Sequence, residues 1–150
     1  MSAPAFTPAW WLPSPHLQTL WGSLCRTAPK LQRRRERLWL DDGDFLDLDW
    51  YGPHEAEAPL VLVLHGLTGS SSSHYVLGLQ QQLAARGWAS VALNWRGCSG
   101  EPNLLPRGYH SGVSEDLGAV IDAWATRPAP DLSAAAGLPP LRRFSAKHRQ

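Results

Sequence analysis

Apolar residues gather in two short runs that contain almost no polar position. Leu60–Leu64 is apolar throughout, and Trp88–Asn94 is nearly so. Strands without polar alternation are typical of sheets covered on both faces. The pattern predicts two buried strands, Leu60–Leu64 and Ala89–Leu93, which we expect to be parallel neighbours.

Helical patterns follow each predicted strand. Residues 73–86 place apolar side chains on one helical face, and Gly87 follows as a predicted left-handed cap. After the second strand, a loop rich in glycine and proline over residues 96–106 precedes a helical pattern over residues 112–124. Alternating strands and helices predict an α/β fold with a mostly parallel sheet. The helix over residues 73–86 is then a right-handed crossover.

A β-hairpin is predicted upstream of these elements. Residues 37–40 and 45–50 flank the turn sequence Asp41-Asp42-Gly43-Asp44. Acidic and apolar residues alternate in the second strand, which favours a position near a sheet edge. The alternative is that Asp47 and Asp49 are paired carboxylates for acid–base chemistry. The cations between Lys30 and Arg37 are interpreted as a solvated approach to a strand, and the weaker alternative is a nucleic-acid patch.

A short amphipathic helix is predicted near the start of the chain. Ser14 and Pro15 form a helix-start signal, and four apolar residues follow at helical spacing: Leu17, Leu20, Trp21 and Leu24. We expect this helix to pack onto the domain. The alternative, which includes Trp10 and Trp11, is a membrane-surface or acyl-binding element.

Composition narrows the classes of function. The chain has 150 residues, room for one domain, and a formal net charge of +1, which argues against nucleic acid or acidic lipid as its main partner. Two cysteines and six scattered histidines favour neither a disulfide framework nor a metal site, and no cofactor is expected. We see no apolar run of membrane-spanning length and no signal-peptide pattern, so the expected setting is cytoplasmic.

The sequence His65-Gly66-Leu67-Thr68-Gly69 directly follows the first buried strand. It places a turn rich in backbone N–H groups at the carboxyl end of that strand, which is where open α/β sheets bind ligands. The alternative is a strand-to-helix turn that needs glycine for its geometry alone.

Four sequence blocks along the chain carry a resemblance. They are Pro15-His16-Leu17-Gln18-Thr19, Leu64-His65-Gly66-Leu67-Thr68-Gly69-Ser70, Asn94-Trp95-Arg96-Gly97-Cys98-Ser99-Gly100-Glu101-Pro102-Asn103, and Tyr109-His110-Ser111-Gly112 with Asp116. In this order and spacing they resemble the YheT-type branch of the α/β-hydrolases, the AB hydrolase 4 family, over roughly residues 5–125. Only the amino-terminal portion of that family is covered.

The resemblance implies serine-dependent hydrolysis of carboxylic esters, as in short-chain esterases and acylglycerol lipases. It implies that Gly66 and Leu67 form the oxyanion hole, with the Leu67 N–H as a donor, and that His65, Arg96 and Gly97 shape the active-site loop. For Arg96 we expect an ion pair that ties this loop to the fold. Small-molecule esters or acylglycerols are the implied substrates, and peripheral lipid contact is a further option.

The implied mechanism needs a nucleophilic serine on a G-x-S-x-G turn, followed by an acid and a histidine. The sequence contains no such turn. In the family it follows the next strand, expected near residues 130–140, where Pro139 and Pro140 would break a central strand. We therefore expect no catalytic residue in this chain, because the chain is truncated or because its reading frame is lost after about Trp124.

Three regions are expected along the chain. Residues 1–30 form an irregular segment with the short helix, residues 31–127 form the amino-terminal half of a hydrolase domain, and residues 128–150 form a disordered or frame-shifted tail. The chain is expected to be inactive by itself. The alternative function is a non-catalytic remnant that binds lipid or a protein partner, and the oligomeric state is left open.

Overall fold

The computed structural model describes residues 6–53, 58–110 and 112–126. Its elements are, in chain order, α1 (Pro15–Cys25), β1 (Arg34–Trp39), β2 (Phe45–Tyr51), β3 (Leu60–Leu64), α2 (His74–Ala84), β4 (Ala89–Asn94) and α3 (Glu115–Thr126). Every predicted strand and helix is present, although β1 begins three residues earlier and α3 three residues later than predicted. The expectations for residue 111 and for the tail over residues 128–150 lie outside the described residues.

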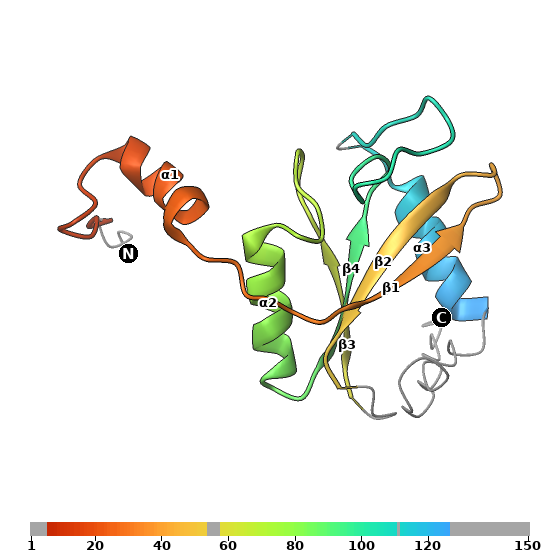
Figure 1. The fold of residues 1–150 in the computed structure, drawn as a ribbon, viewed down its shortest axis with the longest axis horizontal. Helices are drawn as coiled ribbons and strands as arrows, with labels where there is room; N and C mark the ends of the chain where they lie inside the picture. Colours follow the sequence, from red (N-terminus) through yellow and green to blue (C-terminus); the bar gives the residue numbers. More distant parts are fainter. Residues whose placement is uncertain (1–5, 54–57, 111, 127–150) are drawn as a thin grey trace, which may run out of the picture.

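The four strands form one sheet in the order β1-β2-β4-β3 (Figure 1). β3 and β4 are parallel, with Leu60 opposite Ala89 and Leu64 opposite Leu93, as predicted. β1 pairs with β2, and β2 with β4, in antiparallel fashion. The α/β class and the amino-terminal hairpin are confirmed. The described sheet is mixed, with one parallel pairing out of three, because both strands of the hairpin belong to it.

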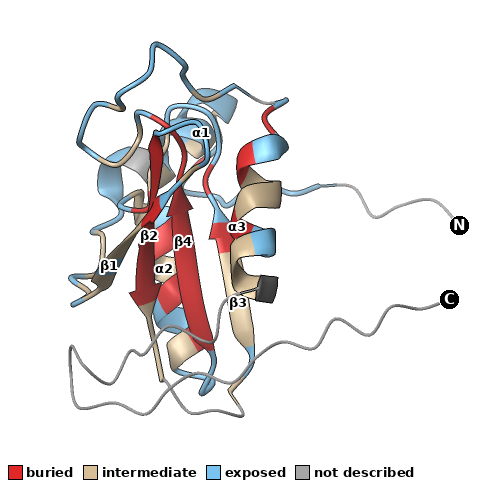
Figure 2. Ribbon diagram, turned by 90° about the vertical axis from the view of Figure 1, so that its right-hand side faces the viewer, coloured by how far each residue is buried: buried red, intermediate tan, exposed pale blue. Residues whose placement is uncertain are grey.

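Helices cover the two faces of this sheet. On one face, Val76 and Leu83 of α2 pack against Val63 and Ala92. On the other, Val120 of α3 joins a larger cluster that also holds Leu38, Leu46, Leu48, Trp50, Val91 and Leu93. Figure 2 shows buried residues concentrated on β2 and β4. The resulting three layers leave the carboxyl ends of β3 and β4 at the same end of the sheet.

β2 lies second from the edge of the described sheet, between β1 and β4, which agrees with its predicted position near an edge. Its acidic residues Asp47 and Asp49 are buried because arginines on the neighbouring β1 pair with them. Three of the adjacent cations, Arg33, Arg35 and Arg37, are therefore partners of these acids, so the interpretation as a solvated approach is wrong for them. Lys30, by contrast, is exposed. β3 lies at the edge of the described sheet, and only Val63 in it is buried, whereas every residue of β4 is buried.

α1 forms where predicted, with Ser14 at the N-cap position and proline in the first turn. The expectation that it packs onto the domain is wrong. Figure 1 shows α1 standing to one side of the sheet, beyond α2, on an extended connection to β1. Its four apolar residues, Leu17, Leu20, Trp21 and Leu24, are all exposed. None of the described helices is long and apolar enough to cross a membrane.

Candidate functional site

The loop after β3 closes into a tight turn over residues 66–69. The Gly69 N–H donates to the Gly66 carbonyl at 3.0 Å, and Thr68 has a left-handed backbone with φ of 62°. A Cβ atom at position 69 would lie 2.9 Å from the Tyr75 hydroxyl and 3.0 Å from the Gly66 carbonyl oxygen. This position therefore requires glycine because the loop backbone and α2 approach it closely.

The ring of His65 is buried and bonded on both nitrogens. Its Nδ1 lies 2.9 Å from the Gly66 carbonyl oxygen, and its Nε2 accepts the Trp95 N–H at 3.3 Å. This pattern assigns a neutral ring with its proton on Nδ1. The Trp95 indole N–H also donates to the His65 carbonyl at 3.2 Å. With both ring nitrogens engaged, His65 holds the loop in place and has no nitrogen left to serve as a base.

The two N–H groups assigned to the oxyanion hole differ in their surroundings. The Gly66 N–H donates to the Tyr75 hydroxyl at 3.1 Å. Among the residues that the structure describes, none accepts a hydrogen bond from the Leu67 N–H, and the Leu67 residue is 68% exposed. The geometry therefore leaves Leu67, and not Gly66, with an N–H free to bind a ligand oxygen.

Two aromatic residues that sequence analysis did not single out support this loop. Tyr109 stacks on Trp95 with ring centroids 4.9 Å apart and an angle of 6° between the planes, and it meets the His65 ring edge to face at 6.0 Å. Both lie within blocks that carry the family resemblance, but their contact joins residues fourteen positions apart across a loop. The spacing alone gave no sign of that contact.

Arg96 is enclosed by three carboxylates, two from the hairpin turn between β1 and β2 and one from α3. It pairs with Asp116 at the start of α3 at 3.0 Å, with Asp44 at 3.0 Å and with Asp42 at 2.7 Å. Its hydrogen bonds to Asp116 and Asp42 raise the pKa of Arg96 above its ordinary value. Arg96 thus makes the expected ion pair. It ties the end of β4 to the hairpin turn and to α3.

Gly97 begins the loop that follows Arg96. Its φ of 76° lies in the left-handed region, which favours glycine, and its N–H donates to the Asn103 side chain. Asn103 in turn donates to the Asp44 carboxylate at 2.7 Å and to the Phe45 carbonyl at 2.8 Å. Burial by itself raises the pKa of Asp44, but the hydrogen bonds donated to its carboxylate lower that pKa below its ordinary value.

Asp49 belongs to a second buried polar cluster, on β2 and the end of β4. Its carboxylate accepts hydrogen bonds from Arg35 at 2.8 and 2.9 Å, from Asn94 at 3.0 Å and from the Ser71 hydroxyl. Burial raises the pKa of Asp49, but these hydrogen bonds lower it below its ordinary value. A carboxylate held ionised by an arginine is a poor proton carrier. The geometry therefore disfavours an acid–base role for Asp49.

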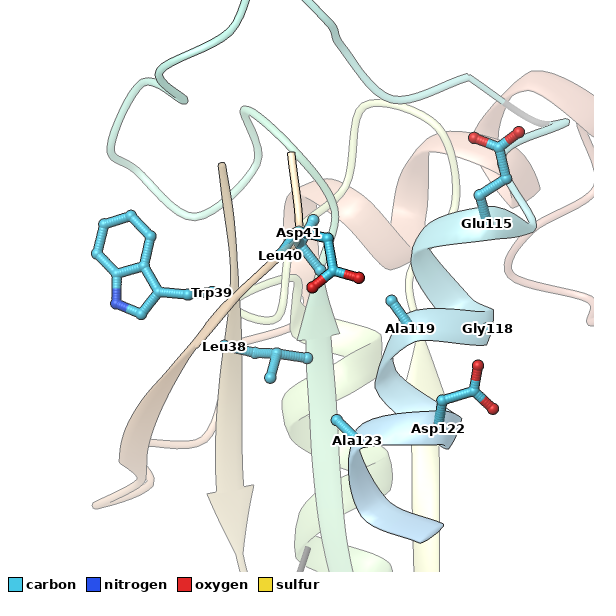
Figure 3. A pocket seen from close by; sticks show the side chains of 9 residues that line it. All are labelled: Leu38, Trp39, Leu40, Asp41, Glu115, Gly118, Ala119, Asp122 and Ala123. Carbon is cyan, nitrogen blue, oxygen red and sulfur yellow. The ribbon is translucent and has the colours of Figure 1, made fainter. Parts of the chain in front are cut away.

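A separate groove of about 510 Å³ lies between β1 and α3 (Figure 3). Leu38 and Ala119 line it, with the acidic residues Asp41, Glu115 and Asp122. None of its lining residues belongs to the loops after β3 and β4. Within the described residues, no group of three or more histidine, cysteine or acidic side chains could hold a metal ion.

Comparisons with known proteins agree with the α/β fold. Residues 59–129 match the alpha/beta hydrolase fold family. Over 103 residues the chain is 48% identical to YheT of Escherichia coli, which is named as an esterase. Over 123 residues it is 32% identical to phospholipase ABHD3 of Mus musculus. These alignments cover 67% and 77% of this chain. The chain spans only 30% of the length of each relative.

A solved structure from Agrobacterium vitis S4, named as a hydrolase, superposes with a TM-score of 0.50 at 16% identity. The superposition covers 65% of this chain and 38% of the other. At this identity the likeness concerns the fold alone.

Proposed function

This chain carries the amino-terminal part of a YheT-type α/β-hydrolase, and we propose that it supplies the oxyanion loop of a serine-dependent carboxylic ester hydrolase. The observation behind the proposal is the Leu67 N–H. It is free of any acceptor among the described residues, and it lies on a loop that Trp95 and Tyr75 hold in place. A donor fixed in advance stabilises the negative oxygen of a tetrahedral intermediate without reorganisation during the reaction.

In this proposal the chain supplies an oxyanion donor but not the nucleophile. The 150 residues contain no G-x-S-x-G turn, so the attacking serine, the acid and the catalytic histidine are not assigned to any residue of this chain. His65 is no substitute, because both of its ring nitrogens are engaged. Gly66 supports the loop through its bond to Tyr75, while Arg96 and Gly97 shape the neighbouring loop.

The proposed substrates are small-molecule carboxylic esters or acylglycerols. The relatives named as an esterase and as a phospholipase support this class, since both names denote the cleavage of ester bonds. By itself the 150-residue chain is expected to be inactive. The alternative, a non-catalytic module that binds lipid or a partner, predicts no dependence of any ester hydrolysis on Leu67.

A chimera tests the proposal. Residues 1–126 of this chain replace the matching part of Escherichia coli YheT, and hydrolysis of p-nitrophenyl esters is compared with that of the parent protein. Leu67→Pro removes the backbone N–H, whereas Leu67→Ala keeps it and serves as the matched control. We expect Leu67→Pro to lower kcat by about 10²- to 10³-fold at nearly constant KM, and Leu67→Ala to retain activity.

Labelling by a fluorophosphonate probe and circular dichroism verify that each chimera is folded and carries its nucleophile. Equal kcat values for folded Leu67→Pro and Leu67→Ala chimeras would contradict the proposed role of Leu67. The isolated 150-residue chain should not react with the probe.

A further inference from the structure

The amino-terminal segment presents an unusually large apolar surface. Leu17, Leu20, Trp21 and Leu24 fall within an arc of roughly 100° on α1, given about 100° of rotation per residue. All are exposed, Leu24 to 76%. Trp10, just before the helix, is 90% exposed. Such a stripe on a helix is normally buried against another surface.

This surface is held together by contacts of its own. Trp11 meets Trp21 edge to face with ring centroids 5.0 Å apart. The Gln18 side chain donates to the Leu12 carbonyl at 2.8 Å, and Leu12 is itself buried. These contacts attach the turn that carries Trp10 and Trp11 to α1. The turn and the helix are therefore joined. We call the exposed apolar residues that they carry together the tryptophan face: Trp10, Trp11, Leu17, Leu20, Trp21 and Leu24.

Charge around the tryptophan face has a single sign. The first acidic residue of the chain is Glu36, so none occurs in residues 1–35. Arg26 and Lys30 follow α1 directly, are exposed, and make no ion pair with a described residue. The net charge of +1 conceals this separation, because the acids of β2 are matched by the arginines of β1.

We propose that the tryptophan face binds the surface of an anionic phospholipid bilayer. Tryptophan rings favour the boundary between acyl chains and headgroups, and lysine and arginine beside an apolar helix face attract anionic headgroups. A second copy of the chain fits less well, since it would bring a second set of unpaired cations close to the first. The face is thus a peripheral membrane contact, separate from the oxyanion loop and independent of catalysis.

Flotation of the full 150-residue chain with vesicles tests this proposal, because bound protein rises while aggregates sink. The vesicles contain equal parts of phosphatidylcholine and phosphatidylglycerol, or phosphatidylcholine alone. We expect the chain to float with the anionic vesicles and to be released by salt. The double variant Trp10→Ser/Trp11→Ser should lose on the order of tenfold or more in partitioning. Trp39→Ser, an exposed tryptophan on β1, is the matched control and should float normally.

A second variant separates charge from apolar contact. Arg26→Gln/Lys30→Gln should reduce partitioning into anionic vesicles by about fivefold for each charge and leave the weak binding to phosphatidylcholine unchanged. Flotation of the Trp10→Ser/Trp11→Ser variant at the level of the unmodified chain would overturn the proposal. A second result would also overturn it: light scattering shows that the unmodified chain is a dimer, that the Trp10→Ser/Trp11→Ser variant is a monomer, and that neither protein floats. The tryptophan face would then bind a second copy of the chain. If the YheT chimera does not float, the rest of the hydrolase covers the face, and the proposal fails for the complete enzyme.

Discussion

The proposed oxyanion role of the loop after β3 is most sharply tested by replacing Gly69 with alanine. The added Cβ would lie 2.9 Å from the Tyr75 hydroxyl, closer than real Cβ atoms approach, and 3.0 Å from the Gly66 carbonyl oxygen, closer than nearly all of them do. Moving either neighbour away from the new Cβ would break a hydrogen bond of the loop. Displacing the hydroxyl breaks its hydrogen bond from the Gly66 N–H, and displacing the carbonyl breaks its bond from the Gly69 N–H.

The magnitude follows from these two bonds. Each hydrogen bond contributes about 1 kcal/mol to stability. Alanine offsets about 0.4–1 kcal/mol of this loss, because it lowers the conformational entropy of the unfolded chain. Gly69→Ala should therefore destabilise the protein by roughly 1–2 kcal/mol. Gly66→Ala is the matched control, because a Cβ there meets no atom within 4 Å. It should change the free energy of unfolding by less than about 1 kcal/mol.

Urea unfolding of the chain measures the stability effect, and the YheT chimera measures the catalytic effect. In the chimera, Gly69→Ala should lower kcat by about 10- to 100-fold or more. A displaced Leu67 N–H would make a weaker hydrogen bond to the negative oxygen of the transition state. KM should change little, because the donor acts on charge that develops in the transition state. Equal stability and equal kcat for Gly66→Ala and Gly69→Ala would refute the argument.

Three further results are expected. Arg96→Met leaves buried carboxylates without their cation and should cost about 3–5 kcal/mol in urea unfolding, whereas an effect below about 1 kcal/mol would show that the ion pairs are dispensable. The pKa values of Asp44 and Asp49 are lowered in the folded state, so their stabilisation is present above the ordinary carboxyl pKa near 4 and is lost as pH falls through the folded values. The free energy of unfolding, measured against pH, should fall in this acid range. Asp49→Asn should make that dependence on pH less steep. Trp95→Phe removes the indole N–H donor to the His65 carbonyl and should cost about 1 kcal/mol, with a change in the His65 ring ¹⁵N shifts that Trp39→Phe does not cause.

Local patterns in the sequence determined the elements of this fold. The strand at Leu60–Leu64, the helix that follows it and the hairpin around Gly43 all form where periodicity and turn residues placed them. Their success has a simple cause, because side-chain period and backbone preference are properties of neighbouring residues. The parallel pairing of β3 with β4 followed from the helix between them.

Tertiary structure decided which groups are paired and which are left available. Asp47 and Asp49 are buried structural anions because β2 lies between β1 and β4, an arrangement that alternation along one strand could not reveal. The family resemblance implied that Gly66 and Leu67 form the oxyanion hole, with the Leu67 N–H as a donor. In the folded structure the Tyr75 hydroxyl on α2 accepts the Gly66 N–H, whereas the Leu67 N–H has no acceptor among the described residues. The amphipathic pattern of α1 was correct, but whether its apolar face is covered depends on distant segments. The partners of hydrogen-bonding groups, charges and apolar faces lie far away in the sequence, and only folding brings them into contact.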